Sequence, residues 1–158
     1  MSNRATVAGI YITPTAGAVM QSVDSIMAIT DKGLEGDRYA AGAGYYSKIE
    51  GWGAQVTLIQ SEAIDAVNTG HDAEYTPEML RRNIVTSGLK LKDLIGCEFT
   101  CGEAVLRGIK LFPPCMRLAQ LCKKREVLQY FSHCGGIGAE VVCGGEIALS
   151  DEVELTQI

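Results

Sequence analysis

The chain has 158 residues, a net charge of −5 and a pI near 5.0, which argues against a nonspecific nucleic-acid partner because such binding needs a basic surface. Hydrophobic residues make up 47% and charged residues 21%, a balance that excludes a disordered chain and fits one domain over residues 1–158. With no signal-peptide pattern and no apolar run long enough to span a bilayer, we expect a cytoplasmic protein without a membrane partner, whose thiols stay reduced.

Short apolar runs separated by 18 glycines predict mostly β structure. The predicted strands cover residues 7–12, 23–29, 55–60, 83–86, 96–100, 103–112, 138–143 and 147–156. The predicted helical segments are 62–67, capped by Ser61 and stopped at Gly70, then 76–80, 116–122 and 127–131. We therefore expect a mainly β fold, a closed or partly closed β-barrel with a few short helices.

Cys115 stands in the sequence Pro113-Pro114-Cys115-Met116-Arg117, between a predicted strand and a predicted helix. Two prolines end a strand, and a thiol at a helix N-terminus faces unpaired N–H groups that favour the thiolate. Thiolate is the form that attacks electrophiles or binds soft metals. The alternative is a small buried hydrophobic residue, the common fate of a free cysteine. The six cysteines contain no Cys-x-x-Cys pair, so a structural zinc site is not expected.

Two charged segments are candidates for anion binding. The first runs from Lys32 to Tyr39 and includes Asp37 and Arg38; its cations could hold a phosphate, and the alternative is a solvated turn with local ion pairs. The second is residues 81–83, two arginines and an asparagine at the start of a predicted strand. There the arginines should point to opposite faces, so that at most one reaches a pocket. The alternative is surface charge that protects a strand edge.

Two further segments are rich in glycine. His133 to Gly138 precedes a strand, so it does not fit a dinucleotide-binding loop and is interpreted as a helix stop that leads into a strand. Residues 39–53 form a predicted long loop, either functional or a mobile excursion. Trp52 in this loop could cover a pocket, although a packing role is favoured.

In order and spacing, these motifs resemble the MOSC domain, named for the C-terminal domain of molybdenum cofactor sulfurase. The segments that carry the resemblance are 33–38, 82–85, 94–96, 114–115 and 144–145. The resemblance implies a barrel-like β fold and makes Cys115 the cysteine that carries sulfur or ligates molybdenum. In larger relatives the domain serves cofactor sulfuration or the reduction of N-hydroxylated compounds. Pyridoxal phosphate is not expected, because no lysine is singled out for a Schiff base.

The leading hypothesis is a protein that binds a molybdopterin-type cofactor and supports reduction of small N-hydroxylated compounds, with Cys115 as catalytic residue and molybdenum ligand. The alternatives are a persulfide carrier, with a sulfur donor or acceptor protein as its partner, and a non-catalytic cofactor-binding module. A redox partner and a homodimer are compatible with these hypotheses. The candidate cofactor-binding residues are Lys32, Asp37, Arg38, Arg81, Arg82, Asn83, which would read the pterin, and Arg117.

Two positions depart from the family pattern. Tyr39 stands where relatives often have histidine, so any imidazole role is lost there. Ser150-Asp151 stands where the closing strands usually carry Gly-Asp, which we interpret as a structural change.

Overall fold

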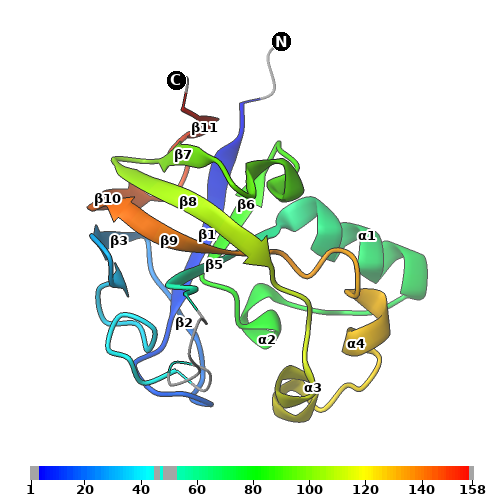
Figure 1. Ribbon diagram of the computed structural model, residues 1–158. Helices are drawn as coiled ribbons and strands as arrows, with labels where there is room; N and C mark the ends of the chain where they lie inside the picture. Colours follow the sequence, from blue (N-terminus) through cyan, green and yellow to red (C-terminus); the bar gives the residue numbers. More distant parts are fainter. Residues whose placement is uncertain (1–3, 45–46, 48–52, 157–158) are drawn as a thin grey trace.

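The computed structural model describes residues 4–44, 47 and 53–156, and it is mainly β (Figure 1). The larger sheet has eight strands, in the spatial order β11 (Val153–Leu155), β7 (Glu98–Cys101), β8 (Ala104–Leu111), β9 (Ile137–Cys143), β5 (Val56–Gln60), β6 (Ile84–Ser87), β1 (Thr6–Ile12) and β2 (Gln21–Ser22). The smaller sheet has the order β10 (Gly145–Ala148), β3 (Ser25–Ile29) and β4 (Gly33–Leu34).

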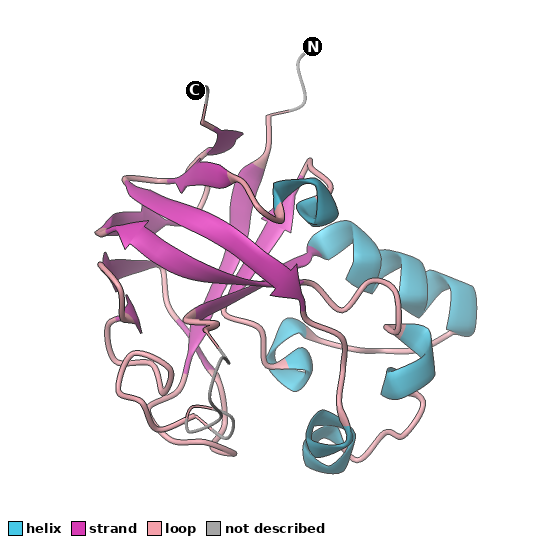
Figure 2. Ribbon diagram, in the orientation of Figure 1, coloured by secondary structure: helices cyan, strands magenta, loops and turns pink. Residues whose placement is uncertain are grey.

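The helices gather on one side of the strands (Figure 2). They are α1 (Ser61–His71), α2 (Pro77–Leu80), the 3₁₀ helix η1 (Leu91–Leu94), α3 (Met116–Cys122) and α4 (Val127–Tyr130). None of the helices in the described ranges is long and apolar enough to cross a membrane.

We expected a closed or partly closed barrel, and the closed form is wrong, because the larger sheet has an open strand order, from β11 at one end to β2 at the other. Near the N-terminus of β1, a single β-bridge between Thr6 and Glu152 and a few neighbouring backbone hydrogen bonds connect this strand to the segment around β11, at the other end of the strand order. In the middle of the sheet, β5 pairs in parallel with β6 across a connection that contains α1 and α2. Strand periodicity does not reveal whether a pair is parallel, so the sequence could not show this crossover.

Most predicted elements are present, with shifted ends. Helix α1 begins after Gln60 rather than Ser61, and it passes through Gly70 to end where Asp72 adopts a left-handed conformation (φ 50°). The helix predicted at residues 76–80 is present as α2: Pro77 is its first residue, and Thr76 caps it by accepting a hydrogen bond from the backbone of Met79.

Apolar side chains cover both faces of the central strands. On β5, Leu58 joins the cluster between the two sheets, which also contains Phe99, while Ile59 joins the cluster beneath the helices, which also contains Phe131. Successive residues of a strand point to opposite faces, so this strand is buried on both sides. The buried sheet is therefore a fixed base for the loops at its end, where the site described next is formed.

Candidate functional site

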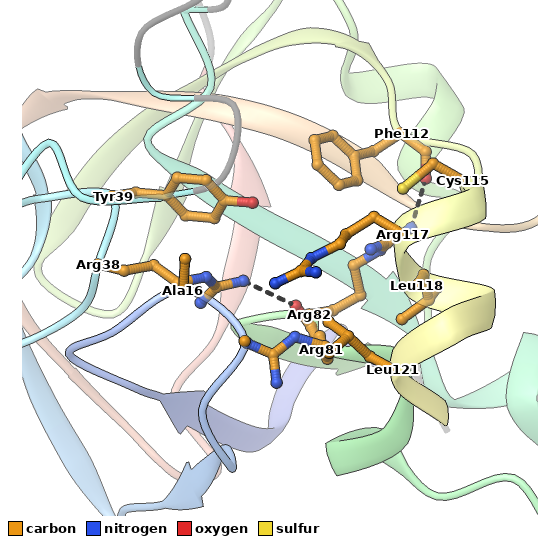
Figure 3. A pocket seen from close by; sticks show the side chains of 11 residues that line it. Ala16, Arg38, Tyr39, Arg81, Arg82, Phe112, Cys115, Arg117, Leu118 and Leu121 are labelled. Carbon is orange, nitrogen blue, oxygen red and sulfur yellow. Dashed lines mark hydrogen bonds between the residues drawn. The ribbon is translucent and has the colours of Figure 1, made fainter. Parts of the chain in front are cut away.

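A small cavity of about 50 Å³, which opens to solvent, lies between the loop after β1, the segment after β4, the end of α2 and helix α3. Figure 3 shows Tyr39 and Arg38 on one side of it and Cys115 on the other, with arginine side chains between them. Its lining residues are Ala16, Gly17, Arg38, Tyr39, Arg81, Arg82, Phe112, Cys115, Arg117, Leu118 and Leu121. We call this cavity the arginine pocket.

Cys115 occupies the position that the sequence predicted, at a strand-to-helix turn. Strand β8 ends at Leu111, the two prolines follow Phe112, and Cys115 is the extended residue (φ −123°, ψ 171°) directly before α3. Its side chain is half-buried, lines the arginine pocket and does not cap the helix. The geometry gives the sulfur a fixed place beside guanidinium groups, while its chemical role stays a prediction.

Asp37 acts behind the pocket rather than inside it. Its carboxylate is buried and accepts hydrogen bonds from the backbone of Thr13 (3.1 Å), the backbone of Tyr39 (3.2 Å) and Nη1 of Arg38 (3.1 Å). The Arg38 guanidinium also lies 4.5 Å from the centre of the Tyr39 ring. Asp37 therefore fixes the arginine and the tyrosine that form one wall of the pocket.

Arg81 ends α2 in a left-handed conformation (φ 58°, ψ 32°), and its side chain turns back to the pocket. Nη1 donates to the carbonyl of Ala18 at 2.6 Å, whereas Nη2 is buried and has no hydrogen-bond partner in the described part of the chain. Burial lowers the pKa of Arg81, and the positive charges of Arg38 and Arg117 lower it further. An anion beside Nη2 would supply the missing hydrogen-bond acceptor and would offset the repulsion between Arg81 and the neighbouring arginines.

Arg82 lines the same pocket, so the prediction that the two adjacent arginines face opposite ways is wrong. Alternation applies within a strand, but Arg81 still belongs to a helix end and β6 begins only at Ile84. Arg82 is 5% exposed, and burial lowers its pKa to about 10.

The pocket carries an excess of positive charge. Four of its lining residues are arginines, and no acidic residue of the described chain lines it. Guanidinium groups bind carboxylate and phosphate oxygens in planar, paired hydrogen bonds. On a protein whose net charge is −5, this local arrangement is typical of a site for an anionic small molecule.

Two predicted cofactor-binding residues lie elsewhere. Lys32 is exposed and borders a separate surface depression beside Glu35. Asn83 is fully buried, where its amide accepts from the backbone and hydroxyl of Thr57 and donates to the carbonyl of Tyr11. The pocket lining therefore includes Arg38, Arg81, Arg82, Arg117 and Cys115. It does not include Lys32, Asn83 or Asp37.

Sequence reasoning missed three parts of the pocket. Tyr39 had a signal, since it directly follows the Asp37-Arg38 motif, and so did the aromatic Phe112 at a strand end. The loop around Gly17 had none, because nothing in its sequence indicates that it folds over Arg117.

The remaining candidate segments have structural places. The glycine-rich segment after His133 joins α4 to β9, as predicted, and Gly136 (φ 103°) packs directly on the backbone of Leu58. Trp52 and most of the second half of the 39–53 loop lie outside the described residues. No group of three or more His, Cys, Asp or Glu side chains within the described ranges is arranged to hold a metal ion.

Solved structures share this fold at low sequence identity. The YuaD protein from Bacillus subtilis superposes with a TM-score of 0.78 at 19% identity, covering 96% of this chain and 95% of that one. YiiM from Geobacillus stearothermophilus gives 0.70 at 13% identity (97% and 75% covered), and YiiM from Escherichia coli gives 0.68 at 20% (96% and 70%). At these identities the likeness establishes the fold alone. A search of curated proteins finds no match.

The family comparison is more specific than the structural one. The MOSC domain profile matches residues 46–154, well over half of the chain, and the match includes Arg81, Arg82 and Cys115. With the fold and the ordered motifs in agreement, the conclusion is direct: the chain belongs to the MOSC domain family.

Proposed function

We propose that the protein binds a molybdopterin-type cofactor in the arginine pocket, with Cys115 as the protein's ligand to molybdenum. The observation that carries the proposal is the meeting of one thiol with four guanidinium groups in a cavity that no described acidic residue lines. A pterin cofactor of this kind carries a phosphate and a thiophilic metal, and these are the partners that arginine and cysteine each select.

The residues present fit such a group. Nη2 of Arg81 is a buried donor with no partner among the described residues, which is the position that a phosphate oxygen would satisfy. Since no three metal-binding side chains gather in the described part of the protein, a metal here must arrive with ligands of its own. A metal already chelated by an organic cofactor meets that condition, while a bare ion does not.

In this proposal each side chain has a distinct task. Arg81 and Arg117 hold the anionic end, and Arg38, fixed by Asp37, adds positive charge to the same wall. Cys115 contributes its sulfur as a thiolate, since a metal ligand must be deprotonated. When bound, the cofactor supplies two-electron redox chemistry at its metal.

We propose further that the protein supports reduction of small N-hydroxylated compounds, as larger relatives with this domain do. The position of Cys115 favours this function over sulfur delivery to another protein. Its side chain is half-buried inside a cavity rather than presented on the surface, so a small molecule reaches it more readily than a partner's cysteine does.

Metal analysis by mass spectrometry tests the proposal on protein purified from a host that makes the molybdenum cofactor. Wild type should carry near-stoichiometric molybdenum, and Cys115→Ala should lose it. Cys143→Ala is the matched control, because Cys143 is an exposed cysteine outside the pocket lining and its loss should leave the molybdenum content unchanged. Full molybdenum in folded Cys115→Ala would refute ligation by Cys115, and none in wild type would refute the cofactor itself.

A further inference from the structure

Arg82 directs its side-chain hydrogen bonds to backbone carbonyls rather than into the cavity that it lines. Nε donates to Gly135 and Nη2 to Phe112, each at 2.8 Å, and Nη1 donates to Leu80 at 3.2 Å. Three of the five N–H groups of the guanidinium are thus fixed by the framework. The Arg82 Cζ also lies over the Phe112 ring, 4.5 Å from the ring centre.

Two of these carbonyls belong to segments that pack on the Cys115 turn. Phe112 immediately precedes the two prolines, and its N–H donates to the carbonyl of Gly136 at 2.8 Å. A Cβ added to Gly135 would lie 2.8 Å from the Phe112 oxygen and 2.9 Å from Cδ of Pro114. The Gly135 loop and the proline turn are therefore in direct contact, and Arg82 connects both of them to the end of α2.

The proline turn needs an anchor of this kind. Pro113 and Pro114 have no backbone N–H, so after Phe112 the chain has no backbone donor to hold it until Cys115. The Arg82 guanidinium donates to the Phe112 carbonyl, and this hydrogen bond holds the turn through a backbone acceptor instead. Cys115 lies close enough that a negative charge on its sulfur would raise the pKa of Arg82.

We propose that Arg82 is a positioning residue, whose guanidinium fork clamps the Phe112–Cys115 turn against the Gly135 loop and keeps the Cys115 sulfur facing the other arginines of the pocket. The inference rests on the proposed function only in taking Cys115 as the reactive group. It assigns Arg82 a task different from that of Arg81, which has a buried donor still available for an anion.

The test compares alkylation of Cys115 by iodoacetate, which is anionic, with alkylation by iodoacetamide, which is neutral. Rates are measured on cofactor-free protein by peptide mass spectrometry, with exposed Cys143 in the same molecule as the internal reference. A sulfur that faces guanidinium groups should favour the anionic reagent relative to Cys143. Arg82→Lys keeps the charge, but a single ammonium cannot donate to the three carbonyls in the same geometry, so this preference should fall severalfold.

A second variant separates position from charge. Gly135→Ala leaves all four arginines in place and pushes on the proline turn, so it should also reduce the preference. It keeps the proposal testable if Arg82→Lys does not fold. Arg107→Lys, at an exposed arginine that pairs with Glu98 and Glu140, is the control and should change nothing.

Unchanged reagent preference in the folded Arg82→Lys and Gly135→Ala proteins would overturn the positioning role. The role is also refuted if Arg82→Gln lowers the preference while Arg82→Lys and Gly135→Ala keep it, because the effect would then be one of charge alone. Since the measurement needs no cofactor, its result is independent of the molybdenum analysis: a protein that shows the predicted losses but binds no molybdenum refutes the proposed cofactor and not the clamp.

Discussion

Replacing Arg81 by glutamine should weaken anion binding in the arginine pocket without greatly destabilising the free protein. Glutamine is also a long unbranched side chain, so the left-handed backbone at this position carries a similar strain before and after the change. The free protein loses the hydrogen bond to Ala18 but is also relieved of repulsion between Arg81 and the neighbouring Arg38 and Arg117. What disappears is a buried charged donor that has no partner among the described residues.

The size of the effect follows from that donor. A hydrogen bond to a charged group contributes about 1.5–3 kcal/mol, and its loss corresponds to a Kd weaker by about 10- to 160-fold. Inorganic phosphate at 100 times the wild-type Kd stabilises by about 2.7 kcal/mol, and a protein of this size gains about 2–4 °C in Tm per kcal/mol. Wild type should therefore gain about 5–11 °C, while a variant with a 30-fold weaker Kd gains only about 2–3 °C.

Thermal unfolding over a phosphate titration measures this difference directly. Sulfate in parallel reports whether the site takes tetrahedral dianions in general, and Arg107→Gln is the control for loss of a surface cation at an exposed site. Equal phosphate-induced Tm shifts in wild type and Arg81→Gln would refute the assignment of Arg81 as an anion ligand.

Three further predictions concern the framework. Burial, with a smaller contribution from Asp151, raises the pKa of Cys101 to about 12 from an ordinary value near 9, so the folded state binds more protons than the unfolded state between these pH values. The free energy of unfolding should therefore fall by about 1.4 kcal/mol per pH unit as pH rises through this window. Denaturant titrations at several pH values should show a smaller fall for Cys101→Ala. Ser150 has φ 72°, a conformation that glycine adopts freely, so Ser150→Gly should raise the free energy of unfolding by up to about 1 kcal/mol. A lower free energy of unfolding for the variant, measured by urea titration, would contradict this account. Gly136 and Gly42 both have positive φ, but a Cβ at Gly136 would clash with the carbonyl oxygen of Leu58, whereas one at Gly42 meets nothing within 4 Å. Gly136→Ala should therefore prevent folding or cost several kcal/mol, while Gly42→Ala should cost about 1–2 kcal/mol. Similar melting temperatures for the two variants would show that the backbone moves away from the added Cβ at little energetic cost.

The parts of the fold that the sequence predicted are those fixed by local chemistry. Thr76 and Pro77 start a helix because of a cap and a preset φ, and the turn at Cys115 follows from two adjacent prolines. The end of α1 could not be predicted from Gly70, because packing of the helix against the sheet outweighs the small cost of one glycine.

The composition of the pocket was predictable only in part, for a similar reason. Arg38 and Arg81 were candidates because of their residue type, but their meeting depends on long-range packing that places the segment after β4 beside the end of α2. The orientation of Arg82 was predicted wrongly because strand alternation was extended to Arg81 and Arg82, which precede β6. The buried amide of Asn83 illustrates the remaining difficulty, since a polar residue in a motif can serve the backbone as well as a ligand.

The central position of β5 has a consequence for synthesis of the protein on the ribosome. Four of its five residues are buried, and one of its two partners, β9, begins almost 80 residues after β5 ends. At a translation rate of about 5–20 residues per second, roughly 4–15 s pass between the synthesis of β5 and that of β9, and during this time one edge and much of the apolar surface of β5 are uncovered. During that interval the nascent chain presents an unpaired, β-branched edge to other chains, which is where misassembly begins. We therefore expect the yield of folded protein to depend on chaperones that bind nascent chains, and to respond to the rate of translation between β5 and β9.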